Sequence, residues 1–154
     1  MKLISIKPAL IARYSAIDGE VLHKDNRPTV LIMRLKYRQK NYEFAVPLRS
    51  NIAPATPKDE YFALPNRKAT KERHHHGLHY AKMFPVSKAY YERYRIEGDI
   101  ASKLYLAIID KNEKEIVDAC QAYLARFEQG IRPVYSTDID ALIKELERLT
   151  SQNG

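Results

Sequence analysis

The chain has 154 residues, of which 45% are apolar and 29% are charged, and this ordinary composition argues against an intrinsically disordered protein. The length suits a single domain over residues 1–154 and is too short for two well-packed ones. Residues 1–96 carry 19 Lys or Arg against 8 Asp or Glu (+11), and residues 97–154 carry 7 against 11 (−4), giving the net charge of +7. Concentrated positive charge favours a polyanionic partner, although many basic proteins bind no nucleic acid.

The sequence carries no membrane or secretion signal. No apolar run approaches the roughly 18 residues that a membrane span needs, and the N-terminal segment lacks a signal-peptide pattern. The single cysteine, Cys120, cannot form a disulfide within the chain. We therefore expect a cytoplasmic protein with no membrane partner.

The first elements are a short strand and a helix. Residues 2–6 alternate between apolar and polar side chains, and Pro8 suits the first turn of a helix that continues over residues 9–14. Residues 18–28 are polar, contain Gly and Pro, and predict a loop.

A β-hairpin follows. Residues 29–37 are β-branched and apolar, residues 42–48 resume the same alternation, and the four polar residues 38–41 predict the turn between them. Pro47 has no N–H to donate, so we expect its end of the second strand at a sheet edge or where pairing stops.

The middle of the chain is the least regular part. Residues 51–76 hold a Pro-rich stretch and the basic run RKATKERHHH, and loops this long are usually functional or mobile. Residues 77–86, GLHYAKMFPV, predict another strand, and residues 87–96 continue as strand or irregular chain.

Three helices are predicted in the acidic part, over residues 99–109, 116–127 and 139–149. Gly130 is placed to end the second helix, and either Ser136 or Thr137 is placed to cap the third. The fold class is therefore α+β, with a mostly antiparallel sheet from the basic part covered by C-terminal helices.

Common cofactor and metal signatures are absent from the sequence. There is no Gly-rich phosphate loop, no Cys-x-x-Cys pair and no Gly-x-Ser-x-Gly elbow. The run His74-His75-His76 with His79 is a poor metal site, because neighbouring histidines rarely point at one centre and Gly77 argues against a helix there. We expect neither a metal nor a cofactor.

Basic and aromatic residues suggest an RNA-binding surface. Tyrosines beside cations can stack on unpaired bases, although any single ring is more simply explained by packing against the sheet. The residues assigned to this surface are Arg27, Lys36, Asn51, Arg67, Lys68, Lys71, Arg73, His76, Tyr80 and Arg93.

The stretch FAVPLRSNIAP, residues 44–54, turns from apolar to polar within one step at Arg49-Ser50-Asn51. Taken alone, this is more simply a solvated strand end than an active site. Together with the later GLHYAKMFPV, however, VPLRSNI resembles the ribonuclease toxins of type III toxin–antitoxin systems, the ToxN/AbiQ group with its relatives CptN and TenpN.

The resemblance implies a compact, barrel-like sheet similar to the MazF/Kid toxins. It implies a sequence-preferring, metal-independent endoribonuclease that cleaves cellular or phage RNA, in phage defence by abortive infection. Cleavage would proceed by 2′-hydroxyl attack and leave a 2′,3′-cyclic phosphate. The implied antitoxin is a small structured RNA, which the toxin processes from a repeated precursor and with which it forms an oligomeric complex.

The family's active-site serine corresponds to Ser50 and its strand lysine to Lys82. The residue before the serine is threonine in some members, and Arg49 is a departure from that pattern. A lysine ahead of the hairpin in some relatives has no clear counterpart, and Arg27 is the nearest basic residue.

The expected chemistry assigns a role to each group. Arg49 can fork onto two phosphate oxygens, Lys82 can act as a point charge, and Ser50 can hydrogen-bond the phosphate or position the 2′-hydroxyl. His79 or His76 is the expected acid or base, because imidazole titrates near neutrality. Two competing hypotheses remain, a non-catalytic RNA-binding module and a ribonuclease toxin neutralised by a protein antitoxin.

Overall fold

The computed structural model describes residues 1–21, 29–93 and 99–153. The helices are α1 (Pro8–Ile17), α2 (Ile100–Lys111), α3 (Glu113–Glu128) and α4 (Ile139–Asn153). The strands are β1 (Leu3–Ile6), β2 (Thr29–Tyr37), β3 (Lys40–Ile52), β4 (Tyr61–Leu64), β5 (His75–His79), β6 (Phe84–Val86) and β7 (Tyr91–Arg93). Single 3₁₀ turns are η1 (Lys58–Glu60), η2 (Tyr80–Lys82) and η3 (Lys88–Tyr90).

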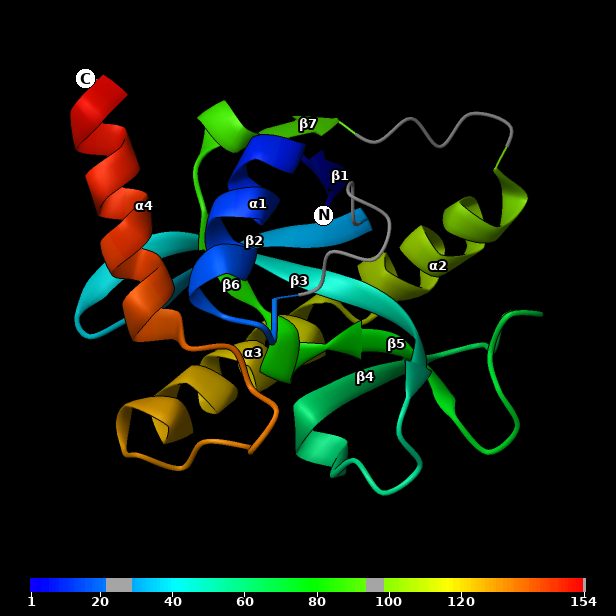
Figure 1. Cartoon of the computed structure of the whole chain (residues 1–154). Coiled ribbons are helices and arrows are strands. Elements are labelled where there is room, and N and C mark those ends of the chain that lie inside the picture. The colour runs from blue at the N-terminus through cyan, green and yellow to red at the C-terminus, as the bar shows by residue number, and fades with distance from the viewer. Residues whose placement is uncertain (22–28, 94–98, 154) are drawn as a thin grey trace.

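The seven strands form one antiparallel sheet in the order β4-β5-β3-β2-β1-β7, with β6 paired to β3 (Figure 1). The α+β class and the antiparallel sheet are confirmed, but the sheet is open and not closed into a barrel. The long β3 holds it together, pairing first with β2 and β6 and then with β5. Pro47 lies where the pairing with β2 stops, as its missing N–H predicts.

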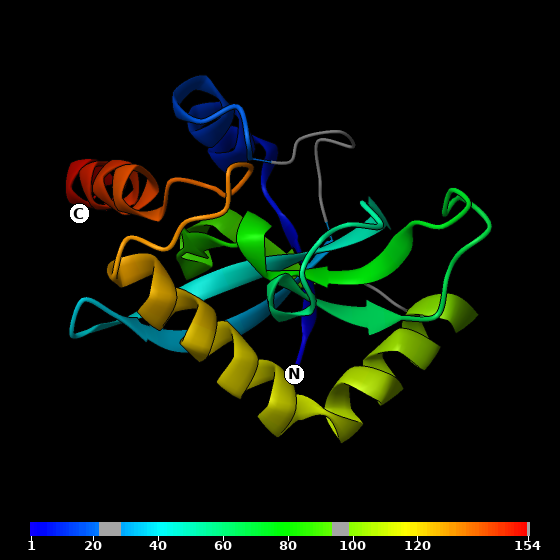
Figure 2. The same cartoon turned by 90° about the horizontal axis from the view of Figure 1, so that it is seen from below.

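Helices cover both faces of the sheet. Alternation along β3 places Phe44 and Val46 in one buried cluster with α2 and α3, and Ala45 in a second cluster with α1 and α4. Figure 2 shows α2 and α3 meeting at an angle beneath the sheet, with α1 and α4 together on its other side. Besides the predicted C-terminal helices, the N-terminal α1 thus contributes to the second layer.

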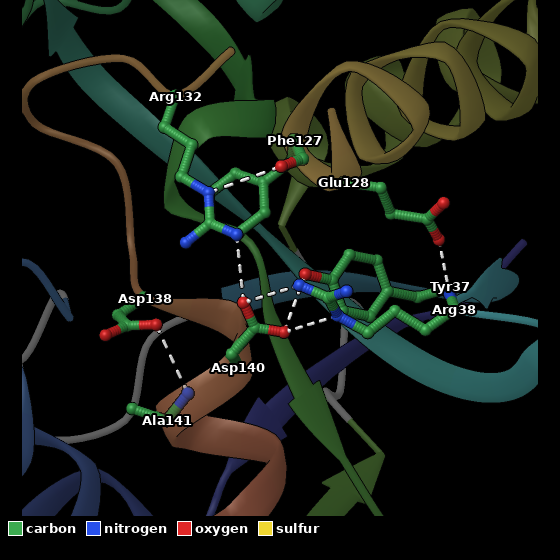
Figure 3. A network of polar contacts seen from close by, with 8 residues as sticks. All are labelled: Tyr37, Arg38, Phe127, Glu128, Arg132, Asp138, Asp140 and Ala141. Carbon is green, nitrogen blue, oxygen red and sulfur yellow. Dashed lines mark hydrogen bonds and ion pairs between the residues drawn. The ribbon is translucent and has the colours of Figure 1, made fainter. Parts of the chain in front are cut away.

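The β2–β3 turn is tighter than predicted. Tyr37 pairs directly with Lys40, so the turn has two residues, Arg38 and Gln39, and the predicted four-residue turn is wrong. Both turn residues have positive φ, 48° and 68°, which matches the twist of the flanking strands. The strain of this backbone is offset by the anchoring of Arg38, whose N–H donates to Glu128 and whose side chain binds Asp140 (Figure 3).

The ends of the later helices are fixed by local hydrogen bonds. Gly130, with φ of +90°, ends α3 as predicted, and the Ile131 N–H donates to the Arg126 carbonyl at 3.0 Å. Helix α4 is capped by Asp138, whose Oδ1 accepts from the Ala141 N–H at 3.2 Å, and not by Ser136 or Thr137 as predicted. Among the described residues, no helix is long and apolar enough to cross a membrane.

Thr137 is fully buried and joins the start of α4 to η2. Its N–H donates to the Ala81 carbonyl at 3.0 Å, and its hydroxyl donates to the Met83 carbonyl. The side chain is therefore used to hold this turn in place, which explains why Thr137 does not cap the helix.

The predicted strand over residues 77–86 is two strands, β5 and β6, separated by η2. The Met83 N–H donates to the Tyr80 carbonyl at 3.0 Å and closes this turn. Strand β4 was not predicted; it pairs with β5 and approaches Gly77 so closely that an added Cβ would lie 2.0 Å from the Phe62 carbonyl oxygen. Glycine is therefore required at this position.

Candidate functional site

The polar residues that follow FAVPL, Arg49 to Asn51, lie within strand β3, which ends at Ile52. Arg49 pairs with Gly77 and Ile52 pairs with His75, so the two residues Ser50-Asn51 face a single residue of β5. This is a β-bulge, which redirects side chains and is common beside active sites. The chain therefore stays in the sheet on both sides of the bulge, and the change from apolar to polar residues coincides with the bulge.

Arg49 and His79 project from neighbouring strands toward one another. Gly77 is opposite Arg49, and His79, two residues further along β5, lies on the same face. Arg49 Nη1 lies 3.2 Å from His79 Nδ1. A guanidinium only donates, so Nδ1 accepts this hydrogen bond and the imidazole proton lies on Nε2.

Burial opposes the charges of both groups. It is the main reason that the pKa of His79 falls from 6.5 to about 3, with further lowering by the positive charges of Arg49 and Lys82. His79 is therefore neutral near pH 7. Burial also lowers the pKa of Arg49, although a guanidinium stays protonated at neutral pH.

Lys82 completes the group from η2. Its side chain is 7% exposed, and its Nζ lies 2.5 Å from Oε2 of Glu20, whose side chain is 39% exposed. Glu20 follows α1, and its N–H donates to Asp18 Oδ1 at 2.9 Å. We call Arg49, His79, Lys82 and Glu20 the β3–β5 charge cluster.

Ser50 lies at the bulge next to Arg49 and is partly exposed. Its hydroxyl makes no hydrogen bond to any described residue, so it is available to an incoming ligand. Chemically, the cluster offers a guanidinium, an ammonium, a carboxylate and a neighbouring hydroxyl, which are groups that can bind and activate a phosphodiester.

A basic loop lies beside the bulge. It connects β4 to β5 and carries four exposed cations: Arg67, Lys68, Lys71 and Arg73. The Lys71 N–H donates to the Asn51 side-chain oxygen at 2.8 Å, which joins the loop to the bulge. This bond places Lys71, one of the four predicted RNA-binding cations of the loop, next to the bulge.

Two predicted RNA-binding residues, His76 and Tyr80, lie in the interior and are each 2% exposed. His76 Nδ1 lies 2.9 Å from the Pro65 carbonyl, to which it donates, and its ring packs on Tyr105. Burial lowers the pKa of His76, and burial raises that of Tyr80, which packs in the core with α3 residues. Both side chains serve packing, so we leave them out of the RNA surface.

The remaining predicted residues lie elsewhere. Lys36 is exposed opposite Asn41 on β3, and the eight residue steps from Asn41 to Arg49 span roughly 25 Å of strand. Arg93 is exposed on β7, at the far end of the sheet from β4. Arg27 lies outside the described residues, which contain no group of three or more His, Cys, Asp or Glu side chains arranged to hold a metal ion.

Glu20 was not among the predicted site residues and falls within a predicted loop. Its contact with Lys82 spans 62 residues of chain. No local spacing relates the two residues, so the sequence alone does not point to this pair.

No protein-family model matches the sequence, and no curated protein matches it. Solved structures do match, over nearly the whole chain. One is AbiQ, a lactococcal anti-phage endoribonuclease of a type III toxin–antitoxin system, with a TM-score of 0.77, 14% identity, and 97% of this chain and 98% of AbiQ covered.

Two further structures are similar. One is from a bacterial antiviral system that a processed non-coding RNA regulates, with a TM-score of 0.72, 16% identity, and 96% of this chain and 98% of that chain covered. The other is from a bacterial type III toxin–antitoxin system in which a non-coding RNA pseudoknot selectively inhibits the toxin, with a TM-score of 0.70, 15% identity and 97% of each chain covered. The predicted resemblance to the ToxN/AbiQ group is confirmed at the level of the fold.

Proposed function

We propose that this protein is the endoribonuclease toxin of a type III toxin–antitoxin system and that a small structured RNA inhibits it. The observation that carries the proposal is the β3–β5 charge cluster, in which Arg49 contacts His79 and Lys82 pairs with Glu20, with Ser50 next to Arg49 in the chain. The fold shared with AbiQ supports the same assignment. Cellular or phage RNA is the substrate, and phage defence by abortive infection is the biological role.

The proposed reaction is metal-independent transesterification, in which the 2′-hydroxyl attacks phosphorus and a 2′,3′-cyclic phosphate forms. Arg49 and Lys82 stabilise the charge that develops on the non-bridging phosphate oxygens, each by about 3 kcal/mol if well placed. Arg49 uses Nη1 to contact His79, which leaves its other N–H groups for the phosphate. Ser50 hydrogen-bonds the phosphate or positions the 2′-hydroxyl.

His79 has a different role from the acid or base expected from its residue type. Its Nδ1 already accepts from Arg49, and a pKa of about 3 makes it a weak base that carries no acidic proton on Nδ1 at neutral pH. We assign it as a positioning residue that orients the guanidinium. Its Nε2–H can also donate to a bound phosphate.

The basic loop extends the proposed RNA path away from the cluster. Its four exposed cations suit the phosphates of a single strand, and Asn51 holds the loop against the bulge. The antitoxin RNA binds over the same cations as the substrate, so inhibition is competitive. The toxin processes this RNA from a repeated precursor and forms an oligomeric complex with it.

The test is incubation of the purified protein with bacterial RNA in EDTA, followed by sequencing of the fragment ends. We expect discrete cuts that share a sequence preference and leave 2′,3′-cyclic phosphates, and a single 2′-deoxynucleotide at a mapped site should block cutting there. RNA that is bound but uncut would instead identify a non-catalytic binding module. Cutting that stops when metal is removed would contradict the mechanism.

The antitoxin is tested separately. RNA transcribed from tandem short repeats ahead of the gene should restore growth to cells that express the toxin. Rescue by a small protein encoded at that place, and not by RNA, would identify a protein antitoxin instead.

A further inference from the structure

The proposed transesterification needs a group that accepts the proton of the attacking 2′-hydroxyl, and most members of the charge cluster cannot do so. Arg49 stays protonated, and the Lys82 ammonium is already paired with a carboxylate. His79 is occupied by Arg49 at Nδ1 and bears its proton on Nε2. Ser50 has a neutral hydroxyl with no base bound to it among the described residues.

Glu20 is the group with basic lone pairs that remains. Its carboxylate pairs with Lys82 and acts electrostatically on Arg49, so it faces the two cations assigned to the phosphate. The side chain is partly open to solvent, which lets a ribose reach it. One carboxylate oxygen contacts Lys82, and the other has no hydrogen-bond partner among the described residues.

We propose that Glu20 is the general base of RNA cleavage. This inference rests on the proposed function. Glu20 takes the proton from the 2′-hydroxyl while the bond from O2′ to phosphorus forms and the bond from phosphorus to O5′ breaks. The departing O5′ takes a proton from water, and Glu20 returns its proton to solvent, so the RNA is split into a fragment that ends in a 2′,3′-cyclic phosphate and a fragment that begins with a 5′-hydroxyl, with no net consumption of water.

The pairing with Lys82 gives Glu20 a second effect. In the free protein the carboxylate neutralises the ammonium, and a bound phosphate takes over that ion pair. The released carboxylate then lies beside the phosphate, within reach of the ribose of the same nucleotide. One movement of Lys82 toward the substrate thereby frees the base.

The test uses a synthetic RNA that contains a cleavage site mapped with the unchanged protein. Glu20→Gln should lower the single-turnover cleavage rate by at least about 100-fold. It should not weaken binding of the same RNA with a 2′-deoxynucleotide at the scissile position: the Kd should stay the same or fall, because a general base contributes to the transition state and because Glu20 no longer competes with the phosphate for Lys82. Glu20→Asp should show an intermediate rate, and Glu147→Gln, an exposed carboxylate on α4, is the matched control.

Three measurements keep a structural effect apart from a chemical one. Thermal melting of Glu20→Gln checks that it folds. In a Lys82→Met background, Glu20→Gln should lower the residual rate further, whereas no further loss would mean that Glu20 acts only by holding Lys82 and would overturn the proposal. Glu20→Asp, which keeps the carboxylate, should restore part of the rate that Glu20→Gln loses, whereas a purely structural role would not distinguish the two variants by their charge.

The outcomes separate this inference from the function on which it rests. A Glu20→Gln variant that cleaves within threefold of the unchanged protein, or faster, would show that the carboxylate only occupies the phosphate site, and the endoribonuclease assignment would stand. No cleavage by the unchanged protein of any RNA would overturn the proposed function and this inference with it.

Discussion

Two clusters of charged side chains in this molecule contain similar residue types, but the surroundings favour the charged forms in one cluster and disfavour them in the other. In the network of Figure 3, Arg38 and Arg132 both bind Asp140, and Tyr37 donates to the same carboxylate at 2.8 Å. These contacts raise the pKa of Arg38 and lower that of Asp140, so they favour the charged forms of both. In the β3–β5 charge cluster, burial lowers the pKa of both Arg49 and His79, so it disfavours their charged forms.

The difference distinguishes a structural clamp from a candidate site. The Figure 3 network joins the β2–β3 turn, the end of α3 and the start of α4, and each of its charges already has a partner within the protein. The charge cluster holds two buried or half-buried cations against one half-open carboxylate, so an incoming phosphate would relieve its electrostatic cost. Perturbed groups of this second kind concentrate at functional sites.

The largest effect is expected from Lys82→Met, which should lower RNA cleavage by about 100-fold or more and remove growth inhibition. Methionine fills the same buried space, and Glu20 is open enough to be solvated, so the free energy of unfolding should change little. Ser50→Ala should likewise reduce cleavage while RNA binding is partly retained. Lys88→Met, at an exposed cation outside the cluster, is the control; equal activity of Lys82→Met and Lys88→Met would show that the site has been located wrongly.

The buried neutral state of His79 predicts a dependence of stability on pH. The unfolded chain binds a proton near pH 6.5 and the folded chain only near pH 3, so the unfolded state holds more protons in between and stability falls as the pH is lowered through this window. The loss from pH 7 to pH 5 is at most about 2 kcal/mol. Urea unfolding at several pH values should show it, and His79→Gln should flatten the curve more than His74→Gln does.

A substitution in the Figure 3 network should lower stability and leave cleavage unchanged, which is the reverse of the effect expected in the charge cluster. Asp140→Ala removes the shared partner of two arginines and a tyrosine, and should lower the free energy of unfolding by about 1 kcal/mol, a modest value because the arginines are partly exposed. Cleavage at a saturating RNA concentration should be unchanged. Asp118→Ala, which breaks an exposed pair with Lys114, is the control and should cost less. Loss of cleavage without loss of stability in Asp140→Ala would remove the distinction between the two groups.

The sequence predicted what depends on local periodicity. The helices, the hairpin and the stop at Gly130 follow from spacing and backbone preference, and the structure contains all of them. It could not predict the break at η2, because Tyr80 and Ala81 are as apolar as the strand residues around them. The β4 strand was hidden in a Pro-rich stretch whose pairing with β5 is not a local property.

The candidate site was predictable only in part, for the same reason. Ser50 and Lys82 were assigned because VPLRSNI and GLHYAKMFPV resemble the toxin family, Arg49 was assigned as the neighbour of Ser50, and the roles of all three stay predictions. His79 was expected to be an acid or base because of its residue type. Its lowered pKa depends on burial and on Arg49, 30 residues away in the chain, and neither can be read from the local sequence. Glu20 is reached only through a contact across the fold.

The smallest predicted effect concerns the basic loop. Because Lys68 and Arg73 are exposed and lie outside the charge cluster, Lys68→Ala and Arg73→Ala should weaken RNA binding without changing the cleavage rate at saturation. Each phosphate contact that is lost should reduce the slope of log K against log salt by about 0.7, the value for single strands. Lys144→Ala, an exposed cation on α4, is the matched control and should leave the slope unchanged. An unchanged slope in both loop variants would place the RNA elsewhere, and would leave the charge cluster as a site without the neighbouring path proposed for it.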